Sequence, residues 1–418
     1  MSDLTDFYQE QVLAGVSDIP WLAQLQHDAL DKFKRLGFPT RKDEEWKYTL
    51  LDGFLKQRFV PADKPCENWV RETDLPIDCN IISINNGVVS GLDALPAGAV
   101  ILPMAQALQS HADKIKPFLG QILKQEHAFH ALNTAMLHHG LFIYLPAGVT
   151  LDAPLLLSHW QDQALQASHV RHLIIAEAGS RATIIEDYQG DASTDYFTNT
   201  VTEVYCGPKS ELTHFKLQRE SKLATHIGHL AVNQAASSQF DSHSFSFGGK
   251  LVRSDITFNL EASHARCSMN GIYAPSEGQH IDHHTLVNHA VPDCNSAQDY
   301  KGILTGHSRA VFNGKVIVAK DAQHTDAKQQ NKNLLLSNNA EIDTKPQLEI
   351  FADDVTCTHG ATVGQLDEEA LFYLATRGIE HAEASHYLIQ AFAAENLRAV
   401  NNEHLAKWLS GLLNQQIG

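Results

Sequence analysis

The feature that most limits the fold of this chain is a long series of short strand-like runs between about residues 141 and 363. Turns with Gly, Ser or Asn separate these runs, and no helical pattern intervenes. Positions just after successive turns recur at intervals of 30, 28, 26, 44 and 31 residues; they are Thr183, Thr213, Asp241, Cys267, Val311 and Ile342. A loose period in the high twenties favours the stacked coils of a β-solenoid, in which each turn covers its neighbour's open edge.

A jelly roll or sandwich is the alternative fold for so many short strands. It would show a more even spacing of about eight to twelve residues per strand, with less repetition at the longer interval. The clearest strand patterns are residues 173–176, 183–186, 255–258 and 315–318. The pattern favours the solenoid and leaves the sandwich open.

Helical patterns precede this β region. Residues 21–36 carry apolar side chains at three- and four-residue steps between Pro20 and Gly37, which predicts an amphipathic helix. We expect a second helix over about residues 121–138, and a strand at 81–84 that enters a turn. The predicted domains are a mostly helical segment 1–140, a β core 141–363 and a helical segment 364–418.

The carboxy-terminal segment also has helical signals. The acidic run 367–369 suits the first turn of a helix, and Arg377 followed by Gly378 suits its end. A further helix is expected from near Ile379. Its apolar stripe of Leu388, Ile389 and Phe392 has two open interpretations, which are packing within the chain and contact with a partner.

One strand-like segment, residues 345–364, carries soft metal ligands. Side chains alternate along a strand, so Cys357 and His359 share one face, roughly 7 Å apart. A thiolate and an imidazole suit zinc or an iron-sulfur unit, but two ligands leave such a site half filled. The alternative is a buried thiol beside a hydrogen-bonded core histidine.

Residues 345–364 and their continuation through Leu374 and residues 377–379 resemble the core signature of the SufB/SufD family. The similarity extends through residues 282–285, 296–302 and 331–337 and covers roughly residues 280–390; a shorter match is Arg41 with residues 45–49. The SufB branch usually carries a close amino-terminal cysteine cluster. Here the closest cysteines, Cys66 and Cys79, are thirteen positions apart, so the resemblance is to the other branch.

The resemblance implies a right-handed parallel β-helix between helical domains, and a non-enzymatic scaffold of the SUF system. Such a subunit would pair with a SufB-like paralogue to build an iron-sulfur cluster at their interface, with a SufC-like ATPase. His359 and Cys357 are the candidate ligands, and Leu388, Ile389 and Phe392 the candidate ATPase contact. A transient cluster is expected only in the complex, none in the isolated chain, which could pair with itself when alone.

A second class of function is a metal-dependent hydrolase or lyase on a β-helix. The chain has 24 histidines, and the densest group is His280, His283, His284 and His289. Imidazole binds zinc and iron. These four do not follow a known ligand spacing, and they also suit a strand whose histidines pair with Asp282 or between turns.

Net charge and apolar runs bear on partners and compartment. A net charge of -17 argues against nucleic acid and anionic membranes, which need clustered Lys and Arg. No apolar run approaches the roughly 20 residues of a membrane span, and residues 1–6 lack the pattern of a signal peptide. Six scattered cysteines do not form a disulfide framework. We therefore expect a cytoplasmic protein with free thiols.

Several catalytic signatures do not occur. Gly314 and Lys315 are followed by Val316 at the wrong spacing for a phosphate loop, so we expect no ATP hydrolysis by the chain itself. His381 and His386 are five apart, not four, which excludes a zinc-protease pair on one helix face. No Gly-x-Ser-x-Gly elbow is present.

Overall fold

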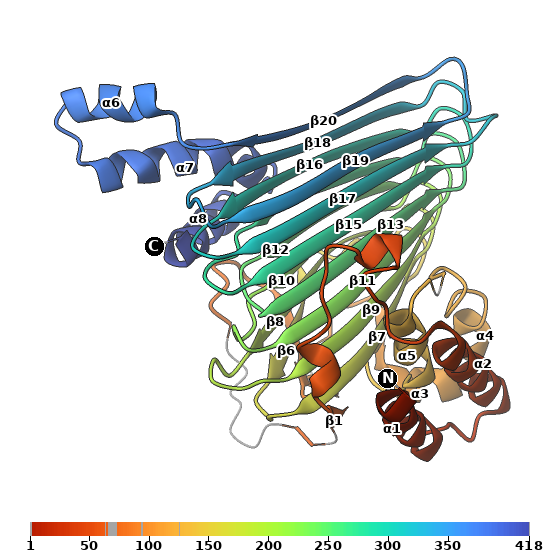
Figure 1. The fold of residues 1–418 in the computed structure, drawn as a ribbon. Coiled ribbons are helices and arrows are strands. Elements are labelled where there is room, and N and C mark those ends of the chain that lie inside the picture. The colour runs from red at the N-terminus through yellow and green to blue at the C-terminus, as the bar shows by residue number, and fades with distance from the viewer. Residues whose placement is uncertain (1, 63, 66–72, 93–94, 125, 418) are drawn as a thin grey trace.

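The fold is a two-sheeted parallel β-solenoid with helices at both ends of the chain (Figure 1). The computed structural model describes residues 2–62, 64–65, 73–92, 95–124 and 126–417. Consecutive long strands alternate between the two sheets, and each pairs with the strand one turn earlier and one turn later. The solenoid predicted from the repeat is thus confirmed, and the sandwich is excluded.

The strands follow a simple order in space. The first sheet contains β19 (Glu341–Ile350), β17 (Arg309–Val318), β15 (His280–His289), β13 (Leu251–Leu260), β11 (Thr225–Gln234), β9 (Phe197–Cys206), β7 (Gln166–Ala176), β5 (Leu141–Leu145) and β4 (Val100–Pro103). The second contains β20 (Thr356–Gly364), β18 (Asp326–Leu335), β16 (Asn295–Leu304), β14 (Arg266–Tyr273), β12 (Gln239–Ser246), β10 (Glu211–Gln218), β8 (Arg181–Gly190), β6 (Leu155–Gln161), β2 (Asn80–Asn85) and β3 (Val88–Ser90). The short β1 (Val60–Pro61) pairs with β7.

The repeat read from the sequence matches the strand register in part. Thr183, Thr213 and Asp241 are direct partners on β8, β10 and β12. The next partner is Ser268, so the predicted anchor Cys267 is one residue early. Val311 lies in the other sheet, on β17, and is paired with Asp343, not with Ile342. The long interval of 44 residues therefore reflects a change of sheet.

The interior of the solenoid is an apolar core built from alternate residues of both sheets. Val252, Phe258 and Leu260 of β13 face it and are almost fully buried. Arg253 and Asp255, between them in sequence, contact the amino-terminal segment on the outer face. This alternation is what a strand covered on both faces requires.

The amino-terminal elements cover the outer face of the first sheet. They comprise α1 (Ser2–Ala14), α2 (Pro20–Leu36), η1 (Glu44–Trp46), η2 (Phe54–Lys56), α3 (Met104–Ser110), α4 (Ala112–Ile115) and α5 (Ala128–Ala135). Helix α2 has the predicted bounds. The helix predicted at 121–138 is shorter, because the backbone N–H groups of Gly120 and Leu123 donate to the Glu203 carboxylate instead.

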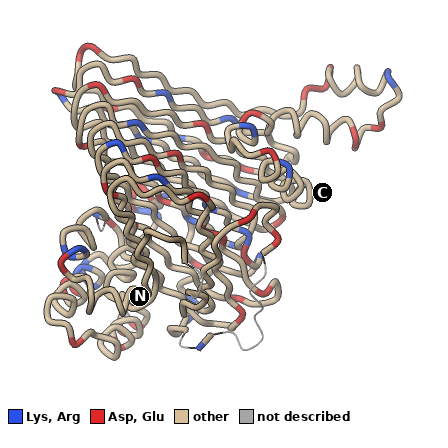
Figure 2. The backbone as a smooth tube through the Cα atoms, turned by 180° about the vertical axis from the view of Figure 1, so that it is seen from behind, with Lys and Arg blue, Asp and Glu red and all other residues tan. Residues whose placement is uncertain are grey.

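The carboxy-terminal helices are α6 (Glu368–Thr376), α7 (His381–Arg398) and α8 (Glu403–Ile417), of which α8 was not predicted. Helices α7 and α8 pack on the outer face of the second sheet. The buried Asn396 of α7 donates to the Asp299 carbonyl and to the Asn270 side chain, which ties α7 to β14 and β16. Helix α6 stands away from the sheets in Figure 1 and, from behind, in Figure 2.

Strands β2, β3 and β4 precede residue 141. The boundaries proposed after residues 140 and 363 stay predictions. At the start of the solenoid, the hairpin of β2 and β3 and the antiparallel β4 form the ends of the two sheets. The turn of the hairpin is Asn86-Gly87, both with positive φ, as expected from the Asn-Asn-Gly sequence.

A fully buried ion pair joins the amino-terminal region to the solenoid. Arg171 of β7 donates to Glu203 of β9 at 2.7 and 3.0 Å, and neither side chain is exposed. Arg171 also donates to Asn133 of α5 at 3.1 Å. The pair therefore holds two strands, α5 and the loop at residues 120–123.

We expect Glu203→Gln to lower the free energy of unfolding by about 3 to 5 kcal/mol, because it leaves a buried guanidinium without its counter-charge. Urea unfolding followed by circular dichroism measures this. The control is Glu211→Gln, which removes the exposed partner of Arg181 and should cost about 0 to 1 kcal/mol. Equal losses in the two variants would contradict the assigned role.

Candidate assembly site at the open end of the solenoid

The predicted ligands lie on the last turn of the solenoid. Strand β20 pairs with β18, and no strand in the described part of the chain covers its other edge. Cys357 is the register partner of Ala327, and His359 is the partner of Gln329. Both partners are buried in the interior. Cys357 and His359 thus end two inward-facing columns, and no described strand lies over either of them. Cys357 is half-buried and His359 is exposed.

The surroundings of Cys357 disfavour a free thiolate. Burial raises the pKa of its thiol, and the nearby Asp326 carboxylate raises this pKa further. The hydrogen bond from the backbone at Ala327 lowers this pKa, but by less than burial raises it. The group is therefore protonated at neutral pH, and binding iron would release a proton. Cys206, Cys267 and Cys294 are also free thiols, and Cys66 lies outside the described residues.

The same end exposes apolar surface. Ile350, Phe351 and Val363 are 39%, 63% and 49% exposed. Three further apolar side chains of the last turn, Ile342, Leu348 and Val355, pack on the interior core and are only partly buried. A last turn of this kind leaves core surface and backbone edges in contact with solvent, which proteins usually cover.

The histidine group of β15 does not form one site. His283 and His289 face the interior, where they hydrogen-bond Ser246 and Ser296. His280 and His284 lie on the opposite face of the strand, against Thr49 and Glu45. Alternation along β15 therefore separates the four imidazoles into two pairs, which removes the geometric basis for a four-histidine metal centre.

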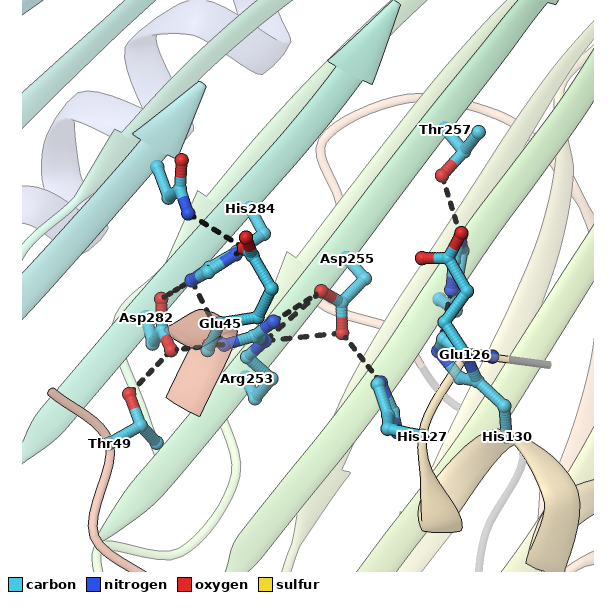
Figure 3. A network of polar contacts seen from close by, with 12 residues as sticks. Glu45, Thr49, Glu126, His127, His130, Arg253, Asp255, Thr257, Asp282 and His284 are labelled. Atoms are coloured by element: carbon cyan, nitrogen blue, oxygen red, sulfur yellow. Dashed lines mark hydrogen bonds and ion pairs between the residues drawn. The ribbon is translucent and has the colours of Figure 1, made fainter. Parts of the chain in front are cut away.

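The outer face of β13 and β15 instead holds a buried polar network (Figure 3). Arg253 donates to Asp255 at 2.8 Å, to Asp282 at 2.7 Å and to the Glu45 carbonyl at 2.7 Å. Its guanidinium lies 4.5 Å from the centre of the Trp46 ring. Thr49 donates to Asp282 as well. The amino-terminal motif at residues 45–49 and the motif at residues 282–285 thus meet through Arg253.

In this network, cationic side chains of the first sheet lie beside carboxylates of the same sheet and of the amino-terminal segment. Burial and Arg253 disfavour protonation of His284, but the Asp282 and Glu45 carboxylates raise its pKa above the usual value. Burial opposes ionisation of Asp255, and Arg253 and His127 hold its pKa well below the usual range. Sequence analysis missed this network because residues 45–49 and Arg253 are about 200 positions apart; alternating polar residues on β13 were the available signal.

The three residues of the predicted ATPase contact differ in how accessible they are. Ile389 is buried, and Phe392 is partly buried, against helices and the second sheet. Leu388 is half-buried. The more accessible apolar residues lie on α6 and the start of α7, where Phe372, Tyr373 and Tyr387 are 72%, 57% and 48% exposed. The signal in the sequence was the apolar run 371–374, which is apolar around a whole turn of a short helix.

Comparisons with known proteins identify the family of this chain. A family model described as "SUF system FeS cluster assembly, SufBD core domain" matches residues 159–392, and "SufBD protein N-terminal region" matches residues 1–157. The chain belongs to the SufB/SufD family of iron-sulfur cluster assembly proteins. Within that family it falls on the SufD side, as the cysteine spacing predicts.

Three relatives illustrate the similarity. Iron-sulfur cluster assembly protein SufD of Escherichia coli (strain K12) is 33% identical over 395 residues, which cover 93% of this chain and 91% of the relative. The SufBD family protein slr0076 of Synechocystis is 30% identical, with coverage of 93% and 90%. Protein ABCI7, chloroplastic, of Arabidopsis thaliana is 27% identical, with coverage of 96% and 87%.

Proposed function

We propose that this chain is a non-enzymatic scaffold subunit that pairs with a SufB-like paralogue and builds an iron-sulfur cluster at their interface. The observation that carries the proposal is the uncovered last turn, which presents Cys357 and His359 side by side. Family membership supports the cargo, because both the family description and the SufD relative are named for cluster assembly.

The geometry favours a shared site. A neutral imidazole at His359 and a deprotonated sulfur at Cys357 suit iron, but a cluster needs more ligands than these two. In the proposal the paralogue supplies the remaining ligands and covers the apolar residues of the last turn. The isolated chain then holds no finished cluster. A second copy of the chain could cover the same edge when the paralogue is absent.

The proposed ATPase partner docks on the projecting helices. Helix α6 stands away from the sheets, so Phe372 and Tyr373 are accessible without any rearrangement (Figure 1). Ile389 and Phe392 support α7 from the other side by packing toward the second sheet. In the proposal, the predicted contact residues mainly hold α7 in position, and the exposed residues of α6 make the contact with the ATPase. These predicted residues are Leu388, Ile389 and Phe392.

The proposed compartment is the cytoplasm. Cys206, Cys267, Cys294 and Cys357 are free thiols, which a reducing compartment maintains. No helix in the described part of the chain has the length and apolarity needed to span a membrane.

We expect His359→Ala to leave stability within about 0.5 kcal/mol, because the side chain is exposed. The complex with the paralogue and ATPase should still form. Its iron and labile sulfide should fall several-fold after anaerobic purification, since one ligand of the shared site is missing.

The control for this variant is His27→Ala, which removes another exposed histidine on α2, far from β20 in sequence and fold. It should keep the full cluster yield. A His359→Ala complex with unchanged iron and sulfide would remove His359 from the assembly site, whatever the effect of the control.

The two docking surfaces can be separated with a reciprocal pair of variants. Phe372→Asp should abolish binding of the ATPase and keep the paralogue, because it places a charge on the projecting helix. Phe351→Asp should do the reverse, because Phe351 lies on the last turn. Pull-downs with each purified partner measure both. Loss of the same partner in both variants, or of neither, would contradict the assignment of two surfaces.

A further inference from the structure

A cluster of metal-ligating side chains lies far from β20, where the first turn of α5 faces the first sheet (Figure 3). His127 precedes α5, and His130 is its third residue. Opposite them, His229, Asp255 and His284 are register partners on β11, β13 and β15 and form one row across the sheet. Residues three apart in a helical turn lie on the same side, so both imidazoles can reach this row.

The distances fit ligands around one ion. One donor atom each from His127, His130 and Asp255 lie within 4.8 Å of one another. Nε2 of His127 is 3.4 Å from Oδ2 of Asp255, longer than the roughly 2.9 Å of a usual N–H···O hydrogen bond. Two ligands on bonds of about 2.1 Å are separated by roughly 3 to 4.2 Å. The spacing therefore suits two ligands of one ion, although His127 and Asp255 also form a long hydrogen bond in its absence.

Neighbouring groups hold these donors in place. Nε2 of His130 is 2.7 Å from Nδ1 of His229, whose Nε2 is 3.1 Å from the Thr257 hydroxyl. Nδ1 of His130 accepts from the Glu126 N–H at 3.3 Å, a hydrogen bond that an ion at this nitrogen would replace. Arg253 donates to the other oxygen of Asp255 at 2.8 Å and, through Nε, to Oδ2 at 3.2 Å. Second hydrogen-bonding partners of this kind orient metal ligands in proteins. In the described part of the chain, Nδ1 of His127 is buried without any hydrogen-bond partner.

The charge of the surroundings suits a cation. The cluster opens into a cavity of about 460 Å³, also lined by Glu45 and Glu126. Arg253 is already matched by Asp255 and Asp282. The Glu126 side chain lines this cavity without a hydrogen bond or ion pair to any described residue. An added positive ion would relieve this excess of carboxylates.

We propose that His127, His130 and Asp255 bind one divalent first-row transition ion, such as Zn²⁺ or Fe²⁺. Two imidazoles and one carboxylate are the donors such ions accept, whereas Mg²⁺ prefers oxygen ligands. Three protein ligands leave coordination positions open toward the cavity. The ion would link α5 to β13 and so stabilise the docking of the amino-terminal region. This site is independent of Cys357 and His359.

The test is a Co²⁺ titration of the full chain after chelator treatment, followed by visible absorption and by calorimetry. We expect one tight equivalent per chain, competed by Zn²⁺ and not by a 100-fold excess of Mg²⁺. His127→Gln and His130→Gln should each weaken binding at least tenfold. The double variant Cys357→Ser with His359→Ala should keep the affinity within about twofold, which separates this site from the proposed assembly site.

Circular dichroism of each variant verifies the fold. His127 is the most informative position, because the only hydrogen bond of its ring nitrogens to a described residue is the one with Asp255. Unchanged Co²⁺ affinity in a folded His127→Gln protein would overturn the proposal. So would the absence of tight binding to the natural chain, or loss of binding in the Cys357 and His359 double variant alone.

Discussion

The parallel backbone ladder is the constraint on which this structure depends. Each internal strand of the solenoid satisfies its N–H and C=O groups with the strands one turn before and one turn after it. A ladder of this kind cannot close on itself, so both ends leave unpaired groups unless another element covers them. The two ends of this chain solve the problem differently. Antiparallel strands β3 and β4 lie at the first end, whereas β19 and β20 end the described solenoid uncovered.

That asymmetry explains where the candidate assembly site lies. Cys357 and His359 belong to inward-facing columns, and in any earlier turn the same positions are buried, as Ala327 and Gln329 are. Only the last turn makes an interior position accessible to iron and to a partner's ligands. The amino-terminal motif contacts the later turns of the solenoid from the outer face. Glu45 pairs with His284 of β15, and Glu44 pairs with Lys345 of β19.

The repeat was readable from the sequence because ladder positions recur with the chain length of one turn. Thr183, Thr213 and Asp241 are true partners for this reason, whereas Cys267 misses by one because the true interval from Asp241 to its partner Ser268 is 27 residues, one longer than the predicted 26. Alternation predicted that Cys357 and His359 share a face. The family signature at residues 345–364 includes that strand.

Other features depend on contacts that sequence periodicity does not encode. The helix predicted from residue 121 begins only at Ala128, because Glu203, some 80 positions later, binds the backbone at residues 120–123. The histidines of β15 are close together in the sequence, but alternation along the strand places them on two opposite faces. The meeting of Arg253 with residues 45–49 joins segments that no local pattern relates.

Hydrogen exchange of the last turn tests the account most directly. Amides of residues 356–364 are followed by mass spectrometry in the free chain and in its complex with the SufB-like paralogue. The account predicts that this strand exchanges faster than β16 in the free chain and gains strong protection in the complex, while residues 80–90 at the first end change little. A complex that protects residues 80–90 and leaves 356–364 unchanged would contradict it.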